Sequence, residues 1–226
     1  MFRGQIAFFS CRANGILQVN NPKPIHMKQC LLSLILFLVI PVAHADTYYP
    51  ATIVFADGKS KTGLVESTFG DHVFFKASEK ANVEKIESAG LSKLIFTIKG
   101  EKREYHYVKT YLGWGQKRIS GSPMWLKVLI NGKATLYLNS TTLSTPSNSQ
   151  NSAGFLDYYC IRKGEPAAKW ISAVSTMNNN QHFRAKAPLY FEDYPELAEK
   201  IKAKEYTWKD IETVVQVYNK WAEKKK

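Results

Sequence analysis

The chain has 226 residues, of which 31 are Lys or Arg and 19 are Asp or Glu, so its formal net charge is +12. This length suits one domain, or two small ones, with a proper hydrophobic core. Three cysteines, two of them before residue 46, exclude an internal disulfide in the remainder of the chain. The basic residues are scattered along the sequence, and the only dense run is Lys224–Lys226. We therefore attribute the net positive charge to solvent-exposed side chains and not to a binding site for an anionic partner.

Met27–Ala45 carries the parts of a secretory signal in the required order. Lys28 supplies the positive start, Cys30–Ile40 supplies eleven mostly apolar residues, Pro41 breaks the helix, and residues 43–45 form a small-x-small cleavage pattern. Such a run is shorter than the roughly 20 residues that span a bilayer. We therefore predict an exported protein, periplasmic or extracellular, that is cleaved after residue 45 and keeps no stable transmembrane segment.

Residues 1–26 precede a signal that has its own methionine and its own basic residue. We interpret them as the result of a mis-assigned start, with translation beginning at Met27. The alternative is an extended n-region that contains Arg3, Arg12 and Lys23. Cys30 opens the apolar stretch instead of following it, which argues against a lipoprotein.

Cleavage at this point leaves 181 residues with a formal charge of +8. The first 45 residues hold four basic residues and no acid, so 27 Lys and Arg remain against 19 Asp and Glu. Cys160 is then the only cysteine, and it lies in the apolar and aromatic run Phe155–Ile161, which predicts a buried thiol. A nucleophile or an intermolecular disulfide is the alternative, but no base is adjacent in the sequence.

Residues 46–140 read as a region of β-hairpins. Strands over Ala51–Ala56 and Lys59–Glu66 flank Asp57-Gly58, a pair that tolerates the positive φ angles of a tight turn. Gly63, inside the second strand, indicates a bulge or a close contact. A further strand is expected over His72–Lys76.

A second hairpin joins Leu91–Ile98 to Arg103–Val108 across a four-residue turn. Successive side chains of a strand point to opposite faces. We therefore expect Tyr105 and Tyr107 on one face of the sheet and His106 on the other.

Asn131-Gly132 is the strongest short hairpin signal in the chain. It joins Met124–Ile130 to Lys133–Leu138. We expect alternating apolar residues of the two strands to face one another across the turn: Leu126, Val128 and Ile130 opposite Ala134, Leu136 and Leu138.

Residues 141–154 are rich in Ser, Thr and Asn and are interpreted as a flexible linker. Residues 155–226 then supply one more hairpin and the C-terminal helices. The hairpin pairs Phe155–Arg162 with Ala168–Val174, and Pro195 begins a helix that runs through Lys202.

The last helix is preceded by Thr207 and Asp210, which resemble a capping box. Four apolar residues follow at helical spacing and predict a buried stripe: Ile211, Val214, Val215 and Tyr218. Together the elements predict an α+β fold. Antiparallel β-hairpins form a sheet or a partly open barrel, and a small helical segment closes the chain.

This succession resembles a family of uncharacterised exported β-rich proteins best known from the Bacteroidetes. The similarity covers most of Ala51–Trp221 and is carried by FADGKSKTGLVE, PMWLKVLINGKATLYL, DYYCIRKGE, YFEDYPELAEKI and DIETVVQVYN. It implies an exported protein with a β-sheet region, a small helical end and unknown activity. It brings no catalytic residues.

No catalytic or metal-binding motif stands out in the sequence. His72, His106 and His182 share no ligand spacing, and HExxH and paired cysteines are absent, so we predict neither a metal site nor a cofactor. No serine lies in a GxSxG pattern, and Gly113-Trp114-Gly115 lacks the third glycine and the βαβ context of a nucleotide site. No catalytic residues are therefore assigned.

The stretch Tyr111–Arg118 has the most binding character, because Trp114 stands between two glycines with Lys117 and Arg118 beside it. Trp114 could stack on a sugar or a peptide, and either cation could pair with an anionic group. The alternative, which we favour, is that Trp114 folds back over the open end of the sheet. His106 is a further candidate, although a surface or hydrogen-bonded histidine is the more ordinary interpretation.

The leading functional hypothesis is a non-enzymatic exported module for binding, envelope association or assembly. Its partner would be an envelope component, a glycan or a peptide. The second hypothesis is an envelope hydrolase whose site is assembled from distant residues such as Glu66, His106 and Asp157. The third is a binder of anionic glycan, lipopolysaccharide or nucleic acid, which ranks last because arginines are few and exported proteins seldom meet nucleic acid.

Overall fold

The computed structural model describes residues 47–113, 115–139, 157–173 and 178–225. The chain divides after Ala45, and all of the described residues belong to the unit Asp46–Lys226. The expected start at residues 1–26, the signal at 27–45, the linker at 141–154 and Trp114 lie outside the described residues.

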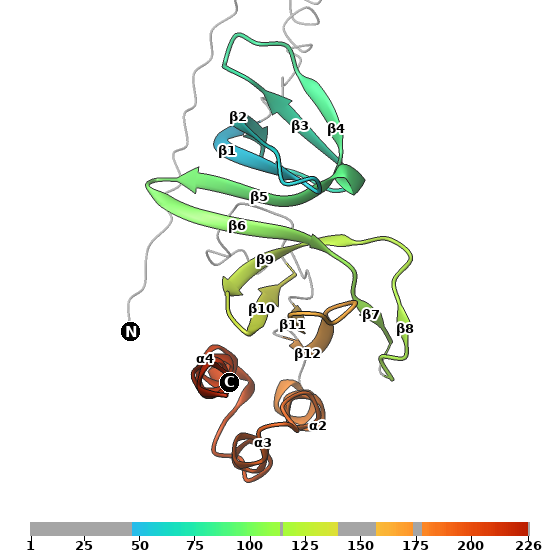
Figure 1. Cartoon of the computed structure of the whole chain (residues 1–226), viewed down its shortest axis with the longest axis vertical. Helices are drawn as coiled ribbons and strands as arrows, with labels where there is room; N and C mark the ends of the chain where they lie inside the picture. The colour runs from blue at the N-terminus through green and yellow to red at the C-terminus, as the bar shows by residue number, and fades with distance from the viewer. Residues whose placement is uncertain (1–46, 114, 140–156, 174–177, 226) are drawn as a thin grey trace, which may run out of the picture. The chain divides into compact units, whose positions relative to one another are not determined.

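A ten-stranded antiparallel sheet dominates this unit (Figure 1). Its strand order is β12-β11-β10-β9-β6-β5-β1-β2-β3-β4, and β7 and β8 form a separate two-stranded hairpin. Residues 46–140 and 155–226 share the sheet, because β10 pairs with β11. The strands are β1 (Tyr48–Phe55), β2 (Ser60–Glu66), β3 (His72–Lys76), β4 (Glu84–Glu87), β5 (Leu91–Ile98), β6 (Glu101–Val108), β7 (Tyr111–Leu112), β8 (Arg118–Ile119), β9 (Met124–Ile130), β10 (Ala134–Leu138), β11 (Asp157–Arg162) and β12 (Lys169–Ala173).

The tight turns occur where the sequence supplies residues that accept a positive φ. Gly58 has a φ of 86° between β1 and β2, which confirms the first predicted hairpin. Between β5 and β6, Lys99 and Gly100 have φ angles of 51° and 83° and make the whole turn. This turn is two residues shorter than expected, because two consecutive positive φ angles reverse the chain without help from the residues that follow.

Gly63 on β2 marks a close contact, as expected from a glycine inside a strand. A Cβ atom added to Gly63 would lie 2.3 Å from the carbonyl oxygen of Lys76 and 2.6 Å from Cε2 of Phe75. Both neighbours belong to β3, so only glycine lets the two strands approach this closely.

The half of the sheet between β9 and β4 curls around a core of its own. Nε1 of Trp125, on β9, donates a hydrogen bond at 3.1 Å to the carbonyl oxygen of Gly70, just before β3, although four strands separate β9 from β3 in the sheet order. Tyr105 is buried in this core and Tyr107 packs against it, which confirms the predicted alternation. We name this group the hairpin-side core: Ala51, Ile53, Val65, Phe69, Val73, Phe75, Leu91, Leu94, Phe96, Tyr105 and Trp125.

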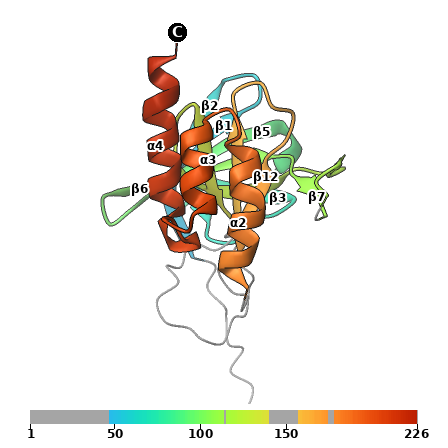
Figure 2. The ribbon, with the colours of Figure 1, turned by 90° about the horizontal axis from the view of Figure 1, so that it is seen from below.

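Helices α2 (Asn179–Tyr190), α3 (Pro195–Lys202) and α4 (Ile211–Lys224) cover one face of the other half of the sheet (Figure 2). α2 packs on β12 and α4 on β9 and β10. α3 lies between α2 and α4 in Figure 2 and farther from the sheet than either of them in Figure 1. None of the described helices is long and apolar enough to cross a bilayer. Their buried residues and those of the sheet form the helix-side core: Ala134, Leu136, Cys160, Ile171, Phe183, Ala187, Tyr190, Phe191, Leu197, Ile201, Ile211, Val214, Val215 and Tyr218.

The sequence predicts α3 and α4 but not α2. The stripe of α4 is buried. Thr207 and Asp210 form the expected capping box, which caps the short 3-10 turn η2 (Trp208–Asp210) that leads into α4. A second 3-10 turn, η1 (Ser88–Gly90), precedes β5. α2 buries Phe183 and Ala187 within a mostly polar sequence, so its apolar periodicity is too weak to predict it.

The β9–β10 hairpin expected at Asn131-Gly132 is present, but neither residue has a positive φ and the turn is wider than two residues. Apolar residues face one another as expected next to the turn but not further along. Ile130 lies opposite Leu136, but a bulge then places Val128 opposite Tyr137. Because one extra residue reverses the faces of the pairs beyond it, Val128 leaves the helix-side core. It packs instead against a small cluster on the other face of the sheet: Leu126, Tyr137 and Ala168.

Candidate functional site

The β7–β8 hairpin lies along the outer edge of β12. The backbone N–H of Tyr111 donates to the carbonyl oxygen of Ala168 at 2.9 Å, and the N–H of Ala168 donates to the carbonyl oxygen of Lys109 at 2.8 Å. Further along the strand, Nε2 of Gln116 donates at 2.8 Å to the carbonyl oxygen of Trp170. These three bonds fix the hairpin as a wall beside the end of the sheet.

A cleft of about 410 Å³ opens between this wall and the strands. Its size falls within the range of small-molecule sites. Aromatic and apolar side chains predominate among the described lining residues, which include one acid and no lysine or arginine. The lining residues are Thr110, Tyr111, Leu112, Gly113, Met124, Asp157, Tyr159, Trp170, Ala173 and His182.

Asp157 is the charged group of the cleft. Its Oδ1 accepts a hydrogen bond at 2.7 Å from Nε1 of Trp170, which lies on the adjacent strand β12. Burial raises the pKa of the Asp157 carboxyl, and the bond from the indole opposes part of this shift. Among the described residues, no cation forms an ion pair with Asp157. The other face of the site is closed by α2, whose His182 ring lies 5.6 Å from the Trp170 ring, centroid to centroid.

A second, smaller pocket of about 220 Å³ shares Trp170 with the cleft. Its character differs, because Lys169 and Lys186 both line it, together with Gln116 and the exposed Leu189. Nζ of Lys169 lies 6.0 Å from the centre of the Tyr111 ring. Of the described lining residues, those of the smaller pocket therefore include two lysines, whereas those of the larger cleft include no lysine or arginine.

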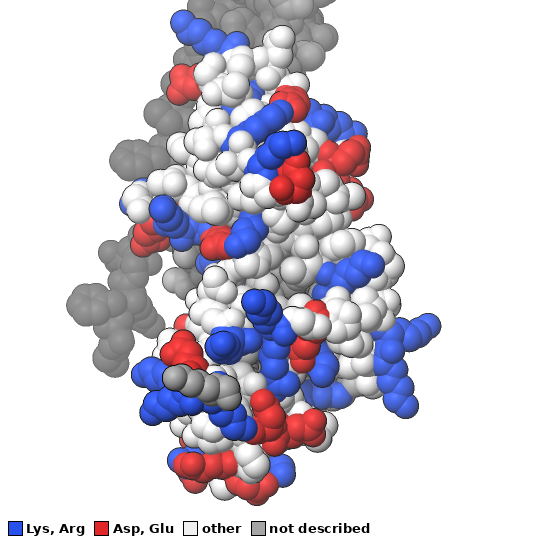
Figure 3. Space-filling view, in the orientation of Figure 1, with Lys and Arg blue, Asp and Glu red and all other residues white. Residues whose placement is uncertain are grey.

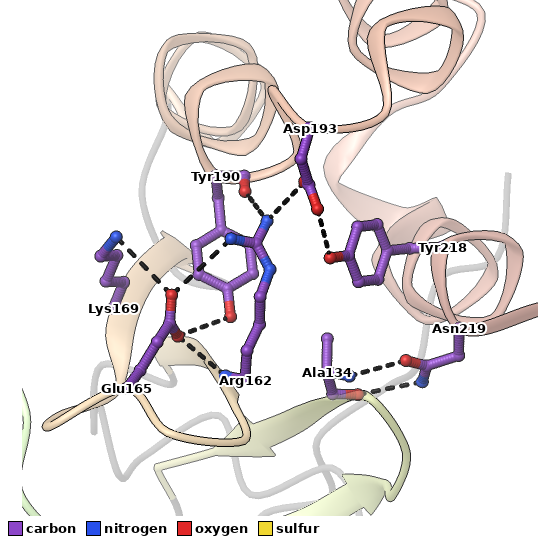
Figure 4. Close-up of polar contacts among 8 residues, drawn as sticks. All are labelled: Ala134, Arg162, Glu165, Lys169, Tyr190, Asp193, Tyr218 and Asn219. Carbon is purple, nitrogen blue, oxygen red and sulfur yellow. Dashed lines mark hydrogen bonds and ion pairs between the residues drawn. The ribbon is translucent and has the colours of Figure 1, made fainter. Parts of the chain in front are cut away.

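A network centred on Arg162 holds the helices to the β11–β12 hairpin (Figure 4). Arg162 Nη2 donates to the carbonyl oxygen of Tyr190 and, at 2.8 Å, to Oδ1 of Asp193, which also accepts the Tyr218 hydroxyl at 2.7 Å on Oδ2. Tyr190 donates its hydroxyl to Glu165 at 3.0 Å. Burial raises the pKa of Tyr218 to about 12, so it remains a donor at neutral pH. The network fixes the C-terminal end of α2, the helix that carries His182.

The predicted candidate His106 lies in a different polar cluster. Its Nδ1 is 2.8 Å from the Tyr137 hydroxyl and its Nε2 is 2.6 Å from Oε1 of Glu104, while its side chain is 13% exposed. Burial lowers the pKa of His106, although the bond to Glu104 opposes this shift. Burial alone would raise the pKa of Glu104, but hydrogen bonds from His106 and from Lys93 lower it. A neutral imidazole that donates to Glu104 and accepts from Tyr137 satisfies both ring nitrogens.

The other predicted candidates are not gathered in the cleft. Lys117 and Arg118 are exposed, and neither lines it. Glu66, on β2, and His106, on β6, do not line it either, so Asp157 is the only residue of the hypothetical hydrolase site that does. The stretch that carries the predicted candidates nevertheless contributes Tyr111, Leu112 and Gly113. The assignment of these candidates as binding residues stays a prediction.

Sequence reasoning missed most of the lining, including Met124, Tyr159, Trp170 and His182. These residues come from three strands and a helix, and no local motif connects them. The one available signal is the pairing of the last hairpin, because Asp157 and Trp170 stand on its two neighbouring strands.

The remaining chemical features of the described residues are few. No group of three or more His, Cys, Asp or Glu side chains among them is placed to hold a metal ion. On the face seen in Figure 3, basic and acidic side chains are interspersed over both the hairpin half and the helix half. No protein-family model, curated protein or solved structure matches the chain. The resemblance to the exported family stays a prediction.

Proposed function

We propose that the protein is an exported, non-enzymatic binding module that holds a small, largely apolar ligand in the cleft between β7–β8 and the ends of β9, β11 and β12. The observation that carries this proposal is the cleft itself, with its volume of about 410 Å³ and its aromatic lining. Pockets of this size, lined by aromatic side chains and a few polar groups, are typical of ligand sites. Its wall is held by backbone hydrogen bonds to Ala168, so the site is formed before a ligand arrives.

Export is the second part of the proposal, and it is supported by the signal-like order of residues 27–45. N-terminal sequencing of protein recovered from outside the cytoplasm should give Asp46 as the first residue. Recovery of the protein from the cytoplasm with its leader intact would contradict export and leave the binding proposal to be tested by itself.

The binding proposal predicts that ligands enter one defined place. Aromatic fragments titrated into the isotope-labelled exported protein should shift the resonances of Tyr111, Met124 and Trp170 together. A Met124→Trp variant fills part of the cleft and should weaken binding by about tenfold or more, equivalent to about 1.4 kcal/mol. Val83→Trp introduces the same side chain at an exposed apolar position that does not line the cleft and should leave binding unchanged. Unchanged binding by Met124→Trp, or shifts confined to other regions, would contradict the proposal.

A hydrolase remains the second candidate, because an acid and a histidine, Asp157 and His182, line the same cleft. Esters, peptides, phosphoesters and glycosides would be screened for turnover by the wild-type protein and by the variants Asp157→Asn and His182→Gln. Turnover that either variant abolishes would establish the enzyme and overturn the non-enzymatic proposal. The module predicts no turnover beyond that of the buffer.

A further inference from the structure

The charge of the lining restricts which ligands the cleft can accept. Among the lining residues that the structure describes, Asp157 is the only acid, and none is a lysine or an arginine. This is unusual for a chain in which basic residues outnumber acidic ones by 31 to 19. An anionic ligand would therefore meet a carboxylate and no compensating cation, even though cations are plentiful elsewhere on the molecule.

Among the described residues, the Asp157 carboxylate has one hydrogen-bond partner, the indole N–H of Trp170 at 2.7 Å. A carboxylate has two oxygens and about four acceptor positions, so most of its capacity is unused by the described residues. It is also half-buried. A charged group withdrawn from water loses hydration free energy that one neutral donor does not restore, and it gains most from a cation placed beside it.

The rings around Asp157 favour the same kind of group. Tyr111, Tyr159 and Trp170 present aromatic side chains to the cleft. The face of such a ring attracts a cation within about 6 Å of its centre. Lys169 lines the smaller pocket and not the cleft; its Nζ lies 6.0 Å from the Tyr111 ring centre, at the limit of this range, and 3.8 Å from Oε1 of Glu165.

From this arrangement we propose that the cleft selects a small organic cation, a protonated amine whose ammonium group hydrogen-bonds to Asp157 and whose apolar part lies among Tyr111, Met124 and Tyr159. This inference rests on the proposed binding function and names its ligand class. The two free-energy contributions act together: the ammonium supplies the missing partner of the carboxylate, and the apolar part is removed from water against the rings.

Three probes that share a phenyl group and differ in charge test the selection. Phenethylamine is a cation at neutral pH, 2-phenylethanol is its neutral counterpart of similar size, and 3-phenylpropionate is an anion. Each is titrated into the exported protein, with the backbone resonances of the cleft and the indole N–H resonance of Trp170 as readouts. Since hydrogen bonds to charged groups contribute more than neutral ones, the amine should bind on the order of tenfold more tightly than the alcohol, and the anion should bind most weakly.

The variant Asp157→Asn removes the charge but keeps an oxygen that can accept the indole N–H. It should reduce the advantage of the amine over the alcohol to about twofold or less, while the alcohol binds as it does to the wild-type protein. Asp71→Asn loses the same charge at an exposed position just before β3 and should retain the full preference. If Asp157→Asn does not fold, Asp157→Ser takes its place. The order in which the wild-type protein binds the three probes tests the proposal without any variant.

The possible results distinguish the proposed selection of cations from the proposed binding function on which it rests. Equal binding of amine and alcohol in the cleft, or a preference for the amine that survives Asp157→Asn, would overturn the selection of cations and leave the binding module standing. Failure of all three probes to shift the cleft resonances would contradict both proposals. A charge-dependent preference that Asp157→Asn removes and Asp71→Asn does not would support both.

Discussion

Asn219 shows how one side chain can take the place of a neighbouring strand. Its Oδ1 accepts the backbone N–H of Ala134 at 2.7 Å and its Nδ2 donates to the Ala134 carbonyl at 2.9 Å, so both backbone groups of that residue are satisfied (Figure 4). Gly132 makes room for this contact, because an added Cβ atom would lie 2.4 Å from Nδ2 of Asn219. Through these two hydrogen bonds, Asn219 attaches α4 to the start of β10.

Asn219→Ala should lower the free energy of unfolding by about 2–4 kcal/mol, because it leaves a buried N–H and a buried C=O without partners. Chemical denaturation of the variant measures the change. Lys220→Ala, at the exposed neighbouring position, should change the stability by less than about 0.5 kcal/mol. A loss for Asn219→Ala no larger than that of the control would show that the two bonds are unimportant.

Cys160 is buried in the helix-side core, as the sequence predicts, and burial raises the pKa of its thiol. The thiolate is the reactive form. The Cys160 thiol of the folded protein should therefore resist a thiol reagent at pH 8 and react rapidly once the protein is denatured. Absorbance of the released chromophore follows the reaction. Rapid labelling under native conditions would be inconsistent with this burial.

His106 should contribute to the loss of stability at mildly acidic pH. Its pKa is lowered in the folded protein, chiefly by burial, whereas an unfolded histidine titrates near about 6.5. As the pH falls below that value, the unfolded chain takes up a proton more readily than the folded chain, so the folded state is disfavoured. Between pH 7 and 5.5 the wild-type protein should lose more stability than His106→Gln in urea unfolding. Parallel curves for the two proteins would refute this role.

At the scale of elements, α2 is stabilised by tertiary contacts that cannot be predicted from its own sequence. The hairpins and the last two helices are predictable because turn residues, caps and apolar spacing act locally. Those signals are weak for α2, which has Pro188 inside it and buries Phe183 and Ala187 within a mostly polar segment. Its position depends instead on β12 beneath it and on Arg162, which bonds to the last residue of the helix.

Arg162→Met should lower the free energy of unfolding by about 2–3 kcal/mol, since it leaves Asp193 without its cation and the carbonyl of Tyr190 without its donor. Tyr218→Phe removes one neutral donor to Asp193 and should cost about 1 kcal/mol. Lys200→Met breaks an exposed ion pair with Glu196 and serves as the control, with an expected change below about 0.5 kcal/mol. Thermal unfolding of the three variants gives the order, and equal effects would rule out a special role for the network.

At the scale of the whole molecule, two cores share one sheet, and β9 belongs to both. Trp125 is buried in the hairpin-side core, whereas Leu129 and Ile130 pack against the helix-side core. The local hairpins could be predicted from the sequence, but the cleft could not. The cleft forms because the fold brings Met124, Trp170 and His182 together from distant positions in the sequence. Short-range sequence patterns carry no information about such long-range contacts.

The shared strand predicts cooperative unfolding. Leu94→Ala in the hairpin-side core and Ile201→Ala in the helix-side core should each lower the stability by about 2–5 kcal/mol, and both should move the same single transition. Circular dichroism in the near and far ultraviolet, recorded for both variants, tests this expectation. Two separate transitions, each sensitive to one variant only, would show that the halves unfold independently.

The segment that forms the wall of the cleft has a further consequence for copies of the protein that meet in a crowded compartment. A terminal strand with free carbonyl and amide groups is a template on which another chain can add a strand and begin a fibre. On β12 the Trp170 carbonyl is occupied by Gln116, and Ala168 just before the strand is bonded on both sides to residues 109 and 111. At the opposite end of the sheet, β4 is only four residues long, and three of them are charged. Both edges of the sheet therefore disfavour the addition of a strand from another chain. The β7–β8 hairpin thus has two effects: it covers the β12 edge and it forms one wall of the cleft.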